Sequence, residues 1–159
     1  MISKKLYFLL LSFAIILISI QLGSGIWLFI SKYGLTPSEV YKYFAGDEES
    51  FIMAKSFEGL IETAVPHFLA ISTTIFVYAH FLLFTKIISE KKKQLLIFGL
   101  FISAILDISS SFFIINGYEI FAFIKIVSFW SFEMLMGLLL YILFWVALNS
   151  YKTQKRKQV

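Results

Sequence analysis

The chain has 159 residues, of which 59% are hydrophobic, 15% are charged and none is cysteine. A soluble domain of this size has too much surface for its volume to hide so much apolar area, so a water-soluble globular fold is excluded. The lack of cysteine excludes disulfides, iron–sulfur clusters and thiol catalysis. The net charge of +4 comes from basic residues clustered beside apolar segments, which indicates membrane topology rather than nucleic-acid binding.

Four long apolar segments follow one another, at residues 6–31, 63–86, 95–116 and 120–149. A helix needs about 20 apolar residues to cross the hydrocarbon layer, and each segment is long enough. Helices satisfy their own backbone groups in lipid, and the alternating segments of a membrane β-barrel are missing from the sequence. The first segment also resembles a secretory signal, but its apolar run resumes after Gly25, which favours an uncleaved anchor. The sequence therefore predicts an all-α integral membrane four-helix bundle, with residues 1–159 as one four-span domain.

Basic residues occur at three places that four crossings would put on the same side of the membrane. They precede the first span, separate the second from the third and follow the fourth: Lys4, Lys5, Lys86, Lys91, Lys92, Lys93, Lys152, Lys155, Arg156 and Lys157. Segments rich in Lys and Arg stay in the cytoplasm. We therefore expect a multi-pass protein of the inner (cytoplasmic) membrane with both termini cytoplasmic and the acidic stretch Asp47–Glu49 outside.

Residues 32–62 form the longest segment between the predicted spans. Thr36, Pro37 and Glu39 have the spacing of a capping box, which predicts a short helix that ends near Gly46. The apolar residues of this helix share one face, which suits a helix lying on the lipid surface. The sequence thus predicts a short extracytoplasmic amphipathic helical loop. It is either a lid resting on the membrane or a docking platform for a periplasmic protein.

Polar residues inside a span are costly in lipid, so each is a candidate functional residue. Matching their depths at a rise of about 1.5 Å per residue predicts two buried polar layers. The layers contain Gln21, Thr73, Asp107 and Ser128 nearer the outside, and His80 with Glu133 nearer the cytoplasm. We expect Asp107 to be neutral and hydrogen-bonded within its layer, and Lys125 to extend to the aqueous interface. These groups either join the helices or contact an ion, a proton or a ligand.

The second span carries both histidines, His67 and His80, which are candidates for cofactor binding together with Met134. In size and helix number the chain resembles membrane b-type cytochromes, whose facing helices supply histidines to haem. The resemblance implies haem b as the candidate cofactor. The chain departs from that pattern because both histidines are on one helix, about 140° apart. A second copy or a methionine would have to complete the ligand set.

No catalytic motif accompanies these residues. Glu58, Glu62 and His67 could hold a metal ion, but their spacing matches no metalloprotease pattern, so the sequence leaves metal binding open. We expect a small polytopic protein without catalysis of its own, an accessory or cofactor-holding subunit of a membrane complex. The alternative is a proton- or ion-conducting oligomer that uses the polar layers. In either case the partners are the lipid bilayer and further copies or subunits, and no nucleic acid.

Reporter fusions test the predicted orientation. A reporter fused after Val159, or inserted between Glu90 and Lys93, should report the cytoplasm, because clustered lysines resist translocation. A reporter inserted at Asp47–Glu49 should report the opposite side. An external signal from the carboxyl terminus would contradict the four-span topology.

Overall fold

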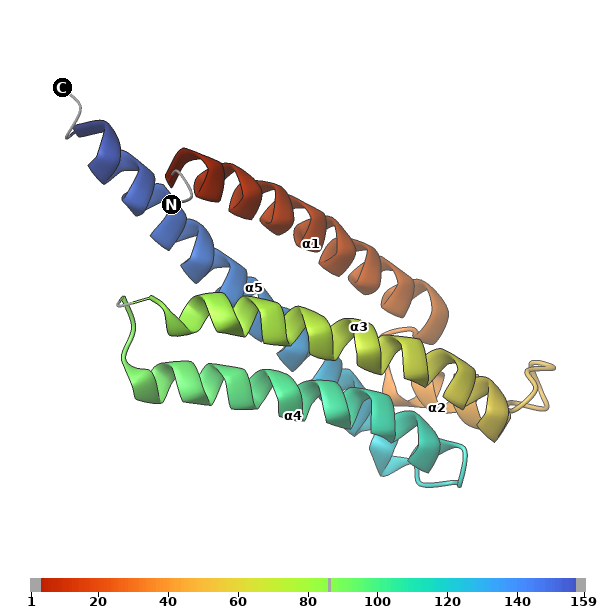
Figure 1. The fold of residues 1–159 in the computed structure, drawn as a ribbon. Coiled ribbons are helices and arrows are strands. Elements are labelled where there is room, and N and C mark those ends of the chain that lie inside the picture. Colours follow the sequence, from red (N-terminus) through yellow and green to blue (C-terminus); the bar gives the residue numbers. More distant parts are fainter. Residues whose placement is uncertain (1–3, 86, 157–159) are drawn as a thin grey trace.

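The structure, a computed structural model, describes residues 4–85 and 87–156. These residues form five helices: α1 Lys4–Tyr33, α2 Pro37–Ala45, α3 Phe57–Leu83, α4 Glu90–Ile114 and α5 Ile120–Arg156. The four long helices are long and apolar enough to cross a membrane. They run lengthwise beside one another, while the short α2 lies at one end (Figure 1). The predicted all-α four-span fold is confirmed.

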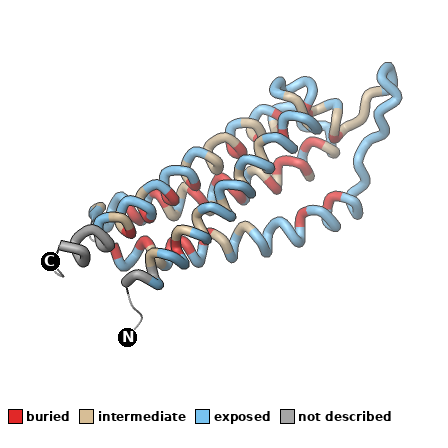
Figure 2. The backbone as a smooth tube through the Cα atoms, turned by 90° about the horizontal axis from the view of Figure 1, so that it is seen from above, coloured by how far each residue is buried: buried red, intermediate tan, exposed pale blue. Residues whose placement is uncertain are grey.

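Helix α5 is the centre of the bundle, since it contacts all four other helices. Helix α4 lies antiparallel to it, and α3 packs mainly on α4. Among the described residues, α1 contacts α5 and α2 but neither α3 nor α4. In the most apolar stretch of each span, 39% of residues are buried in α4 and 33% in α5, against 6% in α1 and 11% in α3. Figure 2 accordingly shows short buried stretches of helix between longer exposed ones.

Two apolar cores stabilise the bundle. The larger core lies where α3, α4 and α5 meet, and contains Ile75, Tyr78, Leu82, Leu96, Leu100, Ala104, Met136, Leu139, Leu140 and Leu143. The smaller core lies under α2 and contains Val40, Phe44, Leu60, Ile114 and Ala122. Small side chains on α4, among them the buried Ser103, Ser110 and Ser111, let α5 approach closely.

Helix α2 has the predicted capping box. The Glu39 N–H donates to Thr36 Oγ1 at 3.3 Å, and the Thr36 N–H donates to Glu39 Oε2 at 2.9 Å. Hydrogen bonds from Thr36 and from the Leu35 N–H hold the pKa of Glu39 below its usual value. The apolar face of α2 does not rest on lipid as expected, because Val40 and Phe44 are buried against the bundle. Helix α2 is therefore part of the tertiary structure.

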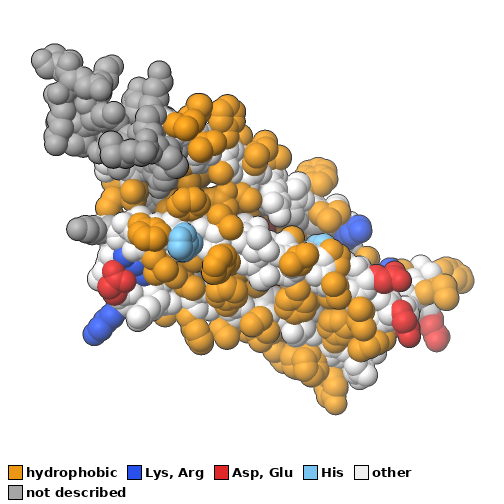
Figure 3. Space-filling model, in the orientation of Figure 1, with side chains coloured by type: hydrophobic (Ala, Val, Ile, Leu, Met, Phe, Trp, Pro, Cys, Tyr) orange, Lys and Arg blue, Asp and Glu red, His pale blue; other side chains and the backbone are white. Residues whose placement is uncertain are grey.

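Charged side chains gather at the two ends of the bundle and hydrophobic ones cover the face between them (Figure 3). The first turn of α1, the α3–α4 turn and the last turns of α5 share one end, and α2 lies at the other (Figure 1). At the α3–α4 turn, Lys93 is buried and its ammonium donates to Leu83 O at 3.1 Å and to Glu90 Oε1 at 2.8 Å. A cation that binds the last carbonyls of a helix stabilises that end. Lys93 thus caps the carboxyl end of α3.

Candidate functional site

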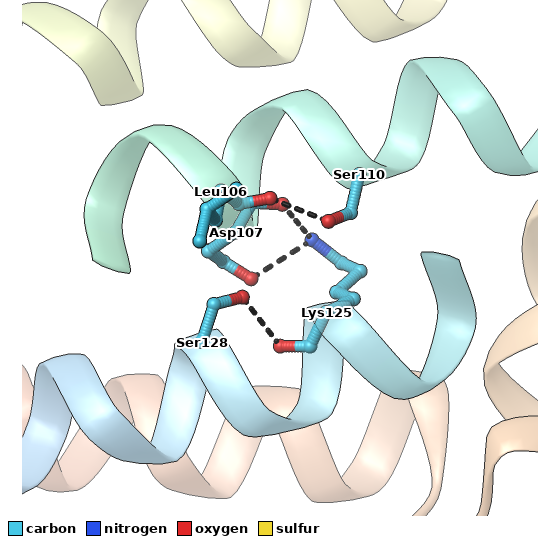
Figure 4. Close-up of polar contacts among 5 residues, drawn as sticks. All are labelled: Leu106, Asp107, Ser110, Lys125 and Ser128. Carbon is cyan, nitrogen blue, oxygen red and sulfur yellow. Dashed lines mark hydrogen bonds and ion pairs between the residues drawn. The ribbon is translucent and has the colours of Figure 1, made fainter. Parts of the chain in front are cut away.

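A buried ion pair joins α4 to α5 near the α2 end of the bundle. The Lys125 ammonium donates to Asp107 Oδ1 at 3.1 Å and to Asp107 O at 2.9 Å (Figure 4). The side chains are 6% and 21% exposed, respectively. The prediction that Lys125 extends to the interface is wrong, because the α4–α5 hairpin brings a carboxylate within reach and lipid cannot hydrate an ammonium.

The serines beside this pair bond to their own helices. Ser128 Oγ donates to Lys125 O at 3.0 Å, and Ser110 Oγ donates to Leu106 O (Figure 4). Ser128 is buried on α5 and faces Asp107, as its expected depth implied. Its hydroxyl nevertheless bonds to backbone, so Lys125 and not Ser128 is the partner of Asp107.

Aromatic rings from α1 and α2 also lie against the ammonium of the pair. The Lys125 ammonium lies 5.6 Å from the ring centroid of Tyr33 on α1 and 5.4 Å from that of Phe44 on α2. The two rings are 5.2 Å apart, and Phe29 stacks on Phe129 at 3.9 Å between centroids. A cation over the faces of aromatic rings is attracted by their quadrupoles. Four helices, α1, α2, α4 and α5, therefore meet around one ammonium.

This arrangement holds the helices together rather than presenting a reactive group. The charges of Asp107 and Lys125 compensate each other, and the ammonium also has a backbone acceptor. A buried pair of this kind is strongly destabilised when one partner is removed. The sequence had indicated Asp107 as a candidate, but it gave Lys125 no role, since the contact joins residues 18 positions apart.

Two residues predicted for the buried layer are exposed. Gln21 lies on a face of α1 that no described helix covers, because α1 packs only on α5 and α2. Thr73 is exposed as well, and Ile75, two residues along α3, is fully buried. Two residues turn a helix by about 200°, so a buried Ile75 directs Thr73 away from the core. The predicted outer layer is thus divided between the interior and the surface of the bundle.

The candidate cofactor ligands do not converge within the chain. His67 is exposed and its Nδ1 lies 3.0 Å from Thr63 O. His80 is exposed next to the ring of Phe84, with 5.0 Å between the ring centroids, and Met134 is 72% exposed on α5. His80 and Glu133, both among the described residues, form no ion pair. The described residues also contain no cluster of His, Asp and Glu that could hold a metal ion.

Glu133 lines a groove of approximately 530 Å3 between α1 and α5. Its side chain is half-buried near the middle of the span Ile120–Asn149. It forms no hydrogen bond or ion pair with another residue in the described part of the chain. The sequence identified the residue but not the groove, which depends on how two distant helices meet.

The ion pair predicts a coupled response to substitution. Asp107→Leu should lower the free energy of unfolding by about 3 kcal/mol, because it leaves a buried ammonium without its counter-charge. Lys125→Met should also destabilise, whereas Asp107→Leu combined with Lys125→Met should recover most of the loss, since apolar side chains replace the pair. Denaturant unfolding in mixed micelles measures these differences, with Glu119→Gln in the exposed turn as the control. Additive losses in the double variant would show that the two residues are not coupled.

Comparison with known proteins identifies a family for the chain. None of the curated proteins and none of the solved structures matches the chain. Residues 34–157 match the family Aq_1264_TM, described as a transmembrane helical domain. The match begins directly after α1 and includes the whole of α2 through α5, and with them the Asp107–Lys125 pair. Because it covers well over half of the sequence, this small membrane protein belongs to the Aq_1264_TM family of transmembrane helical domains.

Proposed function

We propose that the protein is a non-catalytic accessory subunit of the inner membrane that assembles with a second copy of itself inside the bilayer. In this proposal both termini are cytoplasmic and α2 lies outside. The distribution of the basic clusters supports this orientation. The observation that carries the proposal is an uncovered carboxamide at the middle of α1, on Gln21.

Gln21 lies near the middle of the span Phe8–Tyr33 and is exposed. Its side chain makes no hydrogen bond with another residue that the structure describes. A carboxamide that faces hydrocarbon without a partner is costly, and Gln side chains in membranes bond across helices. A second α1, related by a two-fold axis along the membrane normal, brings an identical carboxamide to the same depth. Each amide then donates to the other's carbonyl oxygen.

Single-cysteine cross-linking tests the assembly directly, because the native chain has no cysteine. Leu17 is 65% exposed, one turn from Gln21, so Leu17→Cys should form a disulfide between two copies in oxidised membranes. Leu95→Cys, at a 72% exposed position of α4, is the matched control and should remain monomeric. Adding Gln21→Leu should weaken dimerisation by about 1–2 kcal/mol, the scale of an interhelical hydrogen bond in lipid. Equal cross-linking from both cysteines would contradict the proposal.

In the alternative function, a proton- or ion-conducting oligomer, Glu133 would be the conducting group. A proton or ion path through the predicted outer layer would need an open Asp107, but this carboxylate is paired with Lys125. The paired state supports a structural role for Asp107. Glu133, in contrast, is an intramembrane carboxyl that has no such cation among the described residues.

If the subunit holds a cofactor, we propose that the cofactor is haem b and that His80 is an axial ligand of its iron. The imidazole is exposed one turn before the end of α3, with Phe76 and Phe84 beside it. Exposed imidazole nitrogen between aromatic rings suits a porphyrin iron, and another chain of the assembly would supply the sixth ligand. Because Met134 is exposed on a different helix and His67 faces Thr63 O, neither supports a haem site within one chain.

Absorption spectra test this form of the proposal. Protein purified from haem-replete cells should show Soret and α bands on reduction, and His80→Ala should abolish them because it removes an axial ligand. His67→Ala is the matched control and should keep the bands. A colourless preparation would rule out haem without affecting the dimer, which depends on Gln21.

A further inference from the structure

The groove between α1 and α5 has the dimensions of a ligand site. Its volume of approximately 530 Å3 lies within the range of about 300–1,000 Å3 that small-molecule sites occupy. Its lining is apolar except for the hydroxyl groups of Ser19 and Tyr141 and the carboxyl group of Glu133. Such a lining, mostly apolar with a few polar groups, is typical of sites that bind small apolar molecules.

Two glycines keep this groove open. Gly23 on α1 and Gly137 on α5 both line it, and a Cβ added to either would meet no atom within 4 Å. Small residues in membrane helices usually allow the backbones to approach closely. Here they leave space instead, because α1 does not close onto α5 at this depth. Glu133 lines the same groove, and one of its carboxyl oxygens, Oε1, lies beside α1, since a Cβ on Gly25 would be 3.4 Å from it.

Glu133 differs from the other intramembrane charges in lacking a partner. Asp107 and Lys125, which also lie within the spans, bind each other. Glu133 has no hydrogen bond or ion pair to the residues described in the structure, although its side chain lines the groove. A carboxyl in hydrocarbon needs a hydrogen-bond partner, and an intramembrane acid without one marks a functional site.

The depth of Glu133 restricts the chemistry of that partner. The residue lies near the middle of its span, whereas phospholipid headgroups begin about 15 Å from the bilayer centre. The partner must therefore be carried by a molecule that dissolves in the hydrocarbon layer. We propose that the α1–α5 groove binds an elongated apolar molecule whose hydroxyl group hydrogen-bonds to the Glu133 carboxyl. Long-chain alcohols and alkyl hydroquinones share this chemistry.

Photolabelling of the full-length protein in phospholipid vesicles tests the site. The probe is a long-chain alcohol with a diazirine in its alkyl chain, and mass spectrometry maps the labelled peptides. Labelling should concentrate on residues 15–26 of α1 and 133–144 of α5, which contain the groove lining. Excess hexadecanol or a decyl hydroquinone should compete, and the stronger competitor identifies the source of the hydroxyl. Hexadecane, which lacks a donor, should not compete.

Substitutions separate binding from general lipid contact. Gly137→Leu fills the groove without meeting other atoms at its Cβ, so it should abolish the labelling. Glu133→Leu should reduce labelling about tenfold, the effect of losing about 1.4 kcal/mol of hydrogen bonding. Glu133→Gln should retain it, because a carboxamide still bonds to a hydroxyl. Met134→Leu, at the adjacent exposed position, is the control and should label as the native chain does.

Three results would overturn the proposal. Undiminished labelling of Gly137→Leu would place the probe outside the groove, and competition by hexadecane would show that no hydroxyl is recognised. A disulfide between two copies through Ser19→Cys would show that a second chain fills the groove. Unchanged unfolding of the Gly137 and Glu133 variants in mixed micelles distinguishes lost binding from lost structure. The outcome is independent of the proposed dimer, whose test uses Leu17 and Gln21.

Discussion

Asp107 and Lys125 face each other across the α4–α5 hairpin, where lipid cannot hydrate their charges. The packing of the helices at the α2 end depends on the contacts that these two charged groups make instead. Lys125 reaches the Asp107 carboxylate and the backbone carbonyl of the same residue. Its remaining surface is covered by the rings of Tyr33 and Phe44, from α1 and α2. The cost of burying an ammonium thus favours the docking of two further helices over the hairpin.

The same constraint divides the polar residues of the spans into two kinds. Asp107 and Lys125 are partners of each other, and the Lys125 ammonium also has a carbonyl acceptor, so they stabilise the fold. Gln21 and Glu133 lie at mid-span without a partner among the described residues, one on the surface of α1 and one in the groove beside it. Since lipid cannot satisfy either group, both indicate contacts made outside the single chain.

Both open groups occur around α1, the span with the fewest buried residues. Helix α1 packs against α5 and α2. In the middle of the span, two glycines without side chains leave a space between α1 and α5. A helix with few contacts inside its own chain has surface available for another helix or for a ligand. The tightly packed α4–α5 hairpin, by contrast, supplies rigidity. The residues that match the family, 34–157, include that hairpin but not α1.

The sequence by itself determined the features that depend on neighbouring residues. The four spans follow from the lengths of the apolar runs, and α2 follows from the spacing of Thr36 and Glu39, because helix formation and capping are local.

Only the tertiary structure decided which way the polar side chains face. Equal depth suggested that Gln21 and Asp107 share a layer, but depth does not give the rotation of a helix about its axis. That rotation is set by which helix each span packs against, and α1 packs on α5 rather than on α4. Likewise, the role of Lys125 depended on a carboxylate 18 residues away, and the groove at Glu133 depended on glycines from two separate helices. These contacts join distant parts of the chain, so local sequence patterns do not contain them.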